Sequence, residues 1–312
     1  MADLGPTELR LMQGLAQQVT ALRPELLNGD ATVGELAWVW AKDYDALHQV
    51  WRHRLWFVDG RLAAWGWVYL PYRVPRSDGS FREVGKANLI WQVHPDRPEL
   101  LSEILDWYDE TAGHVDRLLT VQVADVHARA TVAAHGYVLD PEIGADDGSW
   151  VQFNVRDLVD VPEPVLPRGF RFLTAEDVSV ADAVKAHRDA WHPSSFTEAA
   201  LQRVRRTWPY RTDLHVLIEA PDGTLAATAI AWLDDSTRTA EFEPVGTHRD
   251  FRRRGLGTAL QLYGMRRVRA AGADRMFVAC LGAPAHPAAR NMYYGVGFRQ
   301  LSRDLPHIKV AG

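Results

Sequence analysis

Three arginines stand directly before a Gly-x-Gly turn in the stretch Thr247-His-Arg-Asp-Phe-Arg-Arg-Arg-Gly-Leu-Gly-Thr258. The arginines can donate charge-assisted hydrogen bonds to a phosphate, and the glycines allow the backbone to approach it closely. A helix that begins at this turn also directs its free N–H groups and its positive dipole end toward an anion. The segment therefore predicts a pyrophosphate-binding turn. Its expected contacts are Thr247, Arg252, Arg253, Arg254, Gly255, Leu256, Gly257 and Thr258.

Other nucleotide-binding turns fit this spacing less well. A Walker A loop needs a lysine before its Ser or Thr, but Gly257 is followed by Thr258 and Ala259. A dinucleotide-binding fingerprint needs a third glycine, and Leu260 stands at that position. The remaining pattern is Arg-x-x-Gly-x-Gly. An arginine-rich helix start with a solvated face is the alternative interpretation.

The residues around the turn predict the elements that position it. An alternating run over 240–247 predicts a strand that leads into the turn, with Pro244 as a bulge or an edge. Apolar residues at helical spacing follow the turn and predict a helix that ends near Gly272. An apolar strand over 276–280 and a short helix from about Pro287 come next. The segment therefore predicts a strand, an anion-binding turn and a helix in succession.

With these elements in view, the segment from about Phe170 to about Arg303 resembles the GNAT superfamily of acetyl-CoA-dependent N-acyltransferases. In that family the Arg-x-x-Gly-x-Gly turn holds the pyrophosphate of coenzyme A. A later family segment, NxxAxxLYxxxGF, is matched here at Ala289, Tyr293 and Gly297-Phe298. The resemblance implies acetyl-CoA as the cofactor.

The chain departs from the family pattern at three positions. His286 replaces the usual asparagine, Met292 replaces the usual leucine, and Thr247 stands where an apolar residue is commoner. None of the three carries the expected chemistry.

Acyl transfer to an amine needs a base for the ammonium, a donor that polarises the thioester carbonyl, and an acid for the departing thiolate. Glu241 and Glu243 lie two residues apart, so a regular strand places both carboxylates on one face. The resemblance favours Glu241 as the base, while a bulge at Pro244 keeps Glu243 as a candidate. The same bulge would free the N–H of Val245 to polarise the carbonyl. The resemblance implies that Tyr293 is the general acid.

Structural interpretations compete with these roles. Two solvent-facing carboxylates on an edge strand and a core tyrosine on an amphipathic helix would give the same pattern. The resemblance also implies two helices over the acceptor pocket, which His187–Phe196 and the following Trp208-Pro-Tyr210 would supply. Ordinary helix packing explains these aromatic residues equally well.

The N-terminal half repeats the pattern of the C-terminal half at a distance of about 160 residues. A strand pattern follows Asp59-Gly60 as one follows Asp222-Gly223, and Gly136-Tyr137 parallels the later Gly-Phe pair. The anion turn is absent from the first copy, because Pro98 replaces its first glycine and removes an N–H group. Val132 stands where the tyrosine is expected. The first copy therefore reads as degenerate, with a structural role or a share in the acceptor cleft.

These features predict an α/β (α+β) fold made of two tandem GNAT domains, each a mixed, mostly antiparallel sheet flanked by helices. We expect a degenerate domain over 1–160, a Pro-rich linker over 161–168 and a catalytic domain over 169–312. The layout resembles that of mycothiol synthases. Twelve tryptophans are expected to fill the cores or the interface between the domains.

Charge divides the chain in the same way. Residues 1–160 contain 14 Lys and Arg and 24 Asp and Glu, a net charge of −10, whereas 161–312 contain 21 and 16, a net charge of +5. The overall charge of −5 argues against a nucleic-acid partner.

The histidines are scattered, so no metal site is expected, and the start of the chain indicates neither a signal peptide nor a membrane span. With Cys280 as its single cysteine, the protein is expected to be cytoplasmic.

The sequence thus predicts transfer of an acetyl group from acetyl-CoA to the primary amine of a small molecule by direct attack in the C-terminal half. A non-catalytic acyl-CoA-binding module and a protein N-acetyltransferase are the alternatives. The tandem repeat predicts a monomer that forms a pseudo-dimer within one chain, or a weak homodimer.

Overall fold

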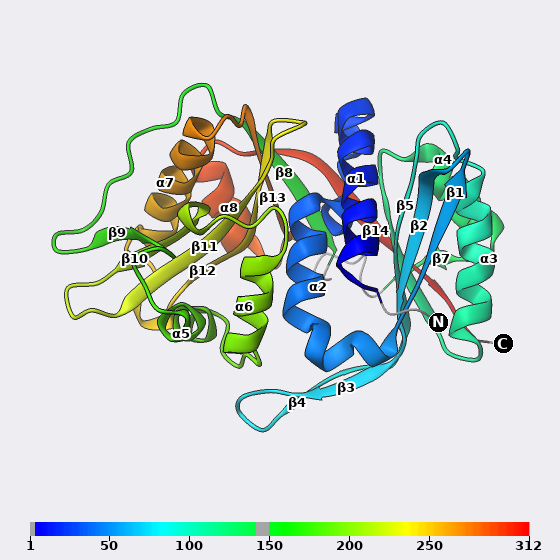
Figure 1. Ribbon diagram of the computed structural model, residues 1–312, viewed down its shortest axis with the longest axis horizontal. Helices are drawn as coiled ribbons and strands as arrows, with labels where there is room; N and C mark the ends of the chain where they lie inside the picture. The colour runs from blue at the N-terminus through cyan, green and yellow to red at the C-terminus, as the bar shows by residue number, and fades with distance from the viewer. Residues whose placement is uncertain (1–3, 142–149, 312) are drawn as a thin grey trace.

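The protein folds around one long, twisted sheet, as Figure 1 shows for the computed structural model, which describes residues 4–141 and 150–311. Within these residues the sheet has twelve strands, in the order β1-β2-β5-β6-β14-β8-β13-β12-β11-β10-β9, with β7 paired to β14. Strands β3 and β4 form a separate hairpin. Most neighbours are antiparallel, but β5 with β6 and β12 with β13 are parallel. The predicted mixed, mostly antiparallel fold is confirmed, although the two sheets are joined into one.

The two halves contribute their elements in similar order. The N-terminal half supplies α1 (Pro6–Leu22), α2 (Val33–Leu47), β1 (Trp51–Val58), β2 (Arg61–Tyr69), β3 (Tyr72–Pro75), β4 (Phe81–Val84), β5 (Ala87–Val93), α3 (Leu100–Ala112), β6 (Arg117–Gln122), α4 (Val126–Ala134), β7 (Val138–Leu139) and β8 (Val151–Asp157). The C-terminal half supplies β9 (Arg171–Thr174), α5 (Val180–Ala190), α6 (Glu198–Arg206), β10 (His215–Glu219), β11 (Leu225–Asp234), β12 (Thr239–Thr247), α7 (Leu256–Ala270), β13 (Arg275–Leu281), α8 (Pro287–Gly295) and β14 (Arg299–Lys309).

The halves exchange their last strands. Strand β8 of the N-terminal half lies between β13 and the first part of β14. The second part of β14 lies between β6 and β7 of the N-terminal half. Each half thus contributes a strand to the sheet of the other half. The linker at 161–168 remains a prediction of where the two domains meet in the sequence.

Helices cover both faces of the sheet. Helices α3 and α4 pack on the N-terminal part and α7 and α8 on the C-terminal part, each pair over its own apolar core. On the other face, residues from α1, α2, α5 and α6 share a single core with Trp65, Trp67 and Trp232, whose side chains are fully buried. Figure 1 shows α2 and α6 side by side where the halves meet, in agreement with their contacts. The expectation that tryptophans fill cores and the interface is confirmed for these three.

The repeat is visible in the hydrogen bonds that end two short helices. After α4 the N–H of Tyr137 donates to the carbonyl of Val132, and after α8 the N–H of Phe298 donates to the carbonyl of Tyr293, at 3.3 and 3.1 Å. The intervening Gly136 and Gly297 have φ values of 81° and 86°, which favour glycine. Val132 therefore occupies the position of Tyr293 in the first copy.

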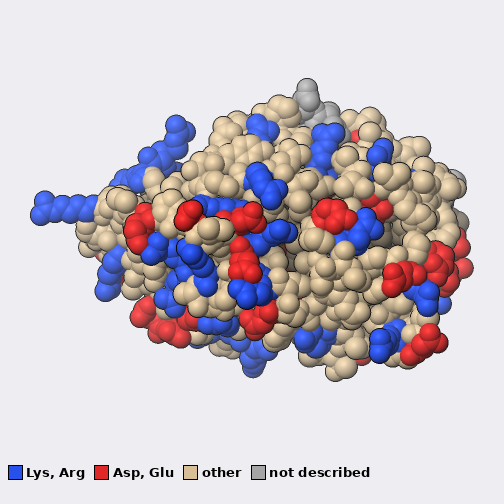
Figure 2. Space-filling model, turned by 90° about the horizontal axis from the view of Figure 1, so that it is seen from above, with Lys and Arg blue, Asp and Glu red and all other residues tan. Residues whose placement is uncertain are grey.

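Lys and Arg gather toward the left of the face in Figure 2, where the C-terminal half lies, with Asp and Glu among them. This agrees with the opposite net charges of the two halves. No helix in the described ranges is both long and apolar enough to cross a membrane. Within 4–141 and 150–311, His, Cys, Asp and Glu side chains form no group suited to hold a metal ion.

Candidate active site

The two central strands of the C-terminal half separate at one end. Parallel pairing of β12 with β13 runs from Thr239 opposite Arg275 to Phe242 opposite Val278. Beyond that point β12 stays paired with β11, whereas β13 stays paired with β8. The gap holds a cavity of about 480 Å³. It is lined by Trp191, Glu243, Pro244, Val245, Ala279, Cys280, Leu281, Ala285, His286, Pro287, Ala288, Ala289 and Tyr293.

The predicted irregularity at Pro244 is present. The register between β11 and β12 shifts where Glu243 and Pro244 pass a single residue between Ala229 and Ala231, as in a β-bulge. The indole N–H of Trp232 donates to the carbonyl of Glu243 at 2.6 Å and holds the bulged backbone. After the bulge Val245 pairs with Ala229 of β11, and it also lines the cavity.

The arginine and glycine turn leads into α7 with the expected geometry. Gly255 is the residue before the helix and has a φ of 78°, the left-handed region that favours glycine. No side chain caps this helix start, so its first N–H groups remain available. An N-terminus of this kind suits a phosphate.

The arginines of the turn differ in what they contact. Arg252 donates to the carbonyls of Thr247 and Ala190, at 3.3 and 3.2 Å, so it also ties the turn to α5. Arg254 donates to the carbonyl of Asp250 at 3.4 Å. All three arginines and Thr258 are exposed, whereas Leu256 is buried in the core.

Gly257 lies where helices α7 and α8 meet. A Cβ atom at this position would lie 2.8 Å from the sulfur of Met292 and 3.7 Å from the hydroxyl oxygen of Thr247. The glycine therefore permits close packing of the two helices beside the turn. Met292 and Thr247, two of the departures from the family pattern, are the neighbours that fill this space.

Glu241 is engaged with the N-terminal half. Its carboxylate is buried and accepts a hydrogen bond from the hydroxyl of Thr32, which caps α2. The backbone N–H groups of Gly34 and Glu35 also stabilise its charged form. Burial outweighs these bonds and raises the pKa of Glu241 to about 8. The carboxylate thus lies against the start of α2.

Glu243 lies at the junction of two cavities. It lines the gap between β12 and β13, and it also lines a second cavity of about 520 Å³ between the two halves. Burial raises the pKa of Glu243 to about 7, and the nearby Lys42 opposes this shift. A carboxyl group with this pKa can accept and release a proton near neutral pH.

Tyr293 stands on α8 at the far side of the first cavity. It is 5% exposed, and its ring meets that of Phe298 edge to face at 5.7 Å between centroids. Burial raises its pKa well above the usual range, with a contribution from Glu243, so the phenol keeps its proton at neutral pH. Cys280 lines the same cavity, accepts a hydrogen bond from Asn154, and has its thiol pKa raised by burial.

The second cavity is walled by residues of both halves. Trp191 lies over the backbone of Gly246, where a Cβ atom would come within 2.4 Å of the indole. His187 stacks on Trp191 at 4.4 Å, and burial lowers its pKa to about 3, which keeps it neutral. Phe196 lies beside them. The segment 187–196 thus lines a cavity beside Glu243, but Trp208 packs against Arg10 of α1 instead.

Sequence reasoning missed the contribution of helix α2. Thr32 holds Glu241, while Trp38 and Lys42 line the second cavity. The half-buried Glu35 lies near Glu243 and Glu241, and desolvation together with their charge raises its pKa. The pattern Thr32-x-x-Glu35 signals a helix start, but it gives no indication of a partner 209 residues away.

Comparison with known proteins agrees with this geometry. Residues 181–298 match the acetyltransferase (GNAT) family. The mycothiol acetyltransferase of Saccharomonospora viridis is 28% identical over 158 residues, which are 47% of this chain and 51% of that protein. The aligned region thus spans about half the length of this relative.

Solved structures resemble nearly the whole chain. A GCN5-related N-acetyltransferase from Sphaerobacter thermophilus has a TM-score of 0.61 at 18% identity, over 98% of this chain and 94% of that one. A tandem GNAT protein from the clavulanic acid biosynthesis pathway has a TM-score of 0.61 at 15% identity, over 100% and 98%. At these identities the likeness establishes the fold. Residues 181–298 therefore match the GNAT acetyltransferase family, and the chain has the fold of tandem GNAT proteins.

Proposed function

We propose that this protein transfers an acetyl group from acetyl-CoA to the primary amine of a small molecule, with the reaction in the C-terminal half. The observation that carries the proposal is the position of Glu243, which lines both the gap between β12 and β13 and the cavity between the halves. One cavity lies in the gap between β12 and β13 beside α8, and the other contains aromatic and charged side chains from both halves. A carboxyl group at their junction suits a base that serves two substrates.

Acetyl-CoA, when bound, supplies the acyl group as a thioester. The uncapped start of α7 and its arginines would hold the pyrophosphate, through Thr247, Arg252, Arg253, Arg254, Gly255, Leu256, Gly257 and Thr258. The left-handed Gly255 and the missing side chain at Gly257 support this fit.

Glu243 would take the proton from an ammonium group in the cavity between the halves. Its pKa of about 7 leaves an appreciable fraction ionised at neutral pH, and Lys42 favours that form. Glu241 suits this role less well, because Thr32 and the start of α2 already engage its carboxylate. We therefore assign the base to Glu243 and a positioning role to Glu241.

The other two groups lie on the first cavity. The N–H of Val245 would polarise the carbonyl that is attacked, as donors of an oxyanion hole do. Tyr293 lines the same cavity and carries its proton at neutral pH, and we propose that its hydroxyl is the group that protonates the departing thiolate. From the sequence we also expect a monomer or a weak homodimer and a cytoplasmic location.

The test is an assay of thiol release from acetyl-CoA against a panel of amines, amino acids, aminoglycosides, peptides and the mycothiol precursor that the name of the relative suggests. We expect amine-dependent turnover that Glu243→Gln lowers without weakening acetyl-CoA binding. Tight acetyl-CoA binding without turnover on any amine would favour a binding module instead. Turnover on peptides alone would favour a protein N-acetyltransferase.

A further inference from the structure

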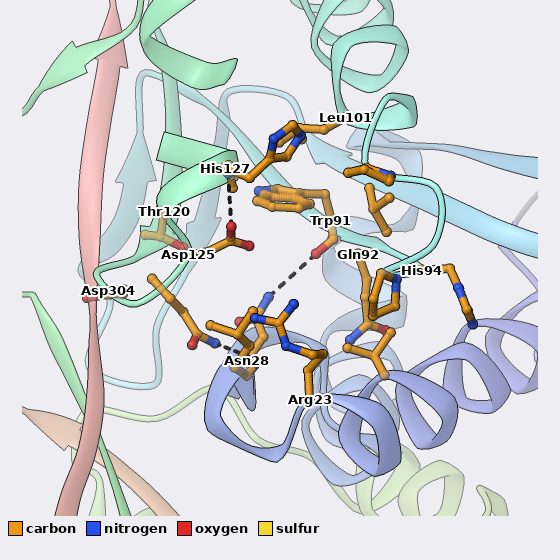
Figure 3. A pocket seen from close by; sticks show the side chains of 17 residues that line it. Arg23, Asn28, Trp91, Gln92, His94, Leu101, Thr120, Asp125, His127 and Asp304 are labelled. Atoms are coloured by element: carbon orange, nitrogen blue, oxygen red, sulfur yellow. Dashed lines mark hydrogen bonds between the residues drawn. The ribbon is translucent and has the colours of Figure 1, made fainter. Parts of the chain in front are cut away.

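The N-terminal half has its own cavity at the position equivalent to the gap between β12 and β13. Parallel pairing of β5 with β6 runs only from Ala87 opposite Arg117 to Leu89 opposite Leu119, and the strands then diverge. The end of α1, the starts of α3 and α4, and β14 close the space (Figure 3). Its volume is about 120 Å³, room for a molecule of a few heavy atoms.

Two buried glutamines of this cavity have side-chain oxygens without a hydrogen-bond donor among the described residues. Gln92 is 6% exposed and Gln122 is 8% exposed, and both line the space. The amide N–H of Gln122 donates to the carbonyl of Leu26 at 3.1 Å, which identifies its oxygen as the unsatisfied acceptor. Buried acceptors without a donor are costly, so these oxygens indicate a missing donor group.

Carboxylates add to the acceptors on the same cavity. Asp304 on β14 is 5% exposed and accepts the N–H of Val151 at 2.6 Å. Asp30 lies behind it and accepts the hydroxyl of Thr120 at 3.0 Å. Burial and the charge of Asp30 raise the pKa of Asp304 to about 7. A cation beside Asp304 would stabilise its ionised form against both burial and the charge of Asp30.

The basic residues on the lining are already engaged or lie toward the edge. Arg23 pairs with Glu25 at 2.5 Å, and its side chain is 45% exposed. His94 lies near Asp96, at 3.8 Å between the imidazole nitrogen and the carboxylate. His127 follows Asp125, whose carboxylate accepts the N–H of Ala128 at the start of α4. Figure 3 shows Asp125 and His127 beside Trp91, across the space from Asn28 and Arg23.

The remaining wall is apolar. Trp91, Leu101, Val93 and Pro98 line it, so a short hydrocarbon body would fit against them. An anion like that expected at α7 would fit poorly, because Pro98 lacks an N–H group and Asp304 carries the wrong charge. The described residues also offer no cluster for a metal ion.

We propose that this cavity binds a small primary ammonium compound, with the ammonium group donating to Gln122 and Asp304, which are paired across β6 and β14, and its hydrocarbon part against Trp91. The site is separate from the proposed acceptor site beside Glu243 and does not depend on catalysis. Because Asp304 belongs to β14, the bound compound would contact both halves at once.

The test is a titration of the full-length protein with ethylamine and ethanolamine, followed by calorimetry and by the indole N–H resonance of Trp91, assigned with Trp91→Phe. Ethanol and acetate serve as the neutral and anionic controls. We expect saturable binding of the amines, absent for the controls, which strengthens from about pH 6 to about pH 8 as Asp304 loses its proton.

Variants locate the site. Asp304→Asn and Gln122→Leu should each weaken amine binding roughly tenfold or more, whereas Glu243→Gln should leave the Trp91 response unchanged. If Asp304→Asn does not fold, Gln122→Leu and the pH dependence of the wild type decide the matter. Equal binding of ethanol, a Trp91 resonance that does not respond, or binding unaffected by Gln122→Leu would each overturn the proposal.

Discussion

The hydroxyl of Thr32 donates a hydrogen bond to the carboxylate of Glu241, across 209 positions of the chain. Thr32 caps α2 of the N-terminal half, and Glu241 lies on β12 of the C-terminal half, directly before the bulge. The degenerate half therefore orients the strand that carries the proposed base. A contact of this kind is what the structural role expected of the first half would require.

The stability of the folded protein should depend on the protonation of Glu241. Burial raises the pKa of Glu241 from 4.5 in the unfolded chain to about 8 in the folded protein, so the folded state binds its proton more tightly. The stability from this protonated carboxyl is fully present below about pH 4.5 and is lost as the pH rises through about 8. Urea unfolding at several pH values should show this decline, and Glu241→Gln should make it shallower. An identical slope in the variant would contradict the shifted pKa.

Removing the base should change the pH profile of the reaction. In the wild type we expect kcat/KM to rise with pH around 7, as Glu243 becomes ionised. Glu243→Gln should lower kcat/KM by about 100-fold or more and remove this rise. Glu241→Gln is the matched control, because the amide oxygen can still accept the hydroxyl of Thr32. A larger loss in Glu241→Gln than in Glu243→Gln would reverse the assignment.

Replacing the proposed acid should separate turnover from binding. Tyr293→Phe keeps the ring that packs against Phe298, so the fold should be unchanged. It should lower kcat by about 10- to 100-fold and leave the dissociation constant of acetyl-CoA nearly the same. Tyr294→Phe on the same helix is the control, since its hydroxyl bonds only Gln152 among the described residues. Full turnover by Tyr293→Phe would remove the tyrosine from the mechanism.

Filling the space at Gly257 should abolish acetyl-CoA binding. A valine there would collide with the sulfur of Met292, 2.8 Å from the Cβ position, and would displace the start of α7. Calorimetry should show loss of acetyl-CoA binding in Gly257→Val and partial recovery in the double variant with Met292→Ala. Gly14→Ala in α1 is the control, because its nearest neighbour lies 3.9 Å from the added Cβ. Unchanged affinity in Gly257→Val would place the cofactor elsewhere.

Much of the C-terminal half follows from local sequence. The strand before the turn, the helix after it and the short helix from Pro287 are present with bounds close to those predicted, because alternation, glycine positions and proline act over a few residues. Pro244 predicted a bulge or an edge, and the structure has the bulge, because β12 is an internal strand whose ladder a proline interrupts.

Only the tertiary structure decided which carboxylate lines the cavities and how the halves join. Glu241 and Glu243 lie two residues apart on β12, but Thr32 engages one while the other lines two cavities. The exchange of β8 and β14 also depends on pairing between residues about 120 to 150 positions apart. The sequence by itself determined the elements and their chemical groups through short-range periodicity and turn geometry. The burial of each group, its bonding partner and its accessibility depend on contacts between distant segments, which local patterns do not encode.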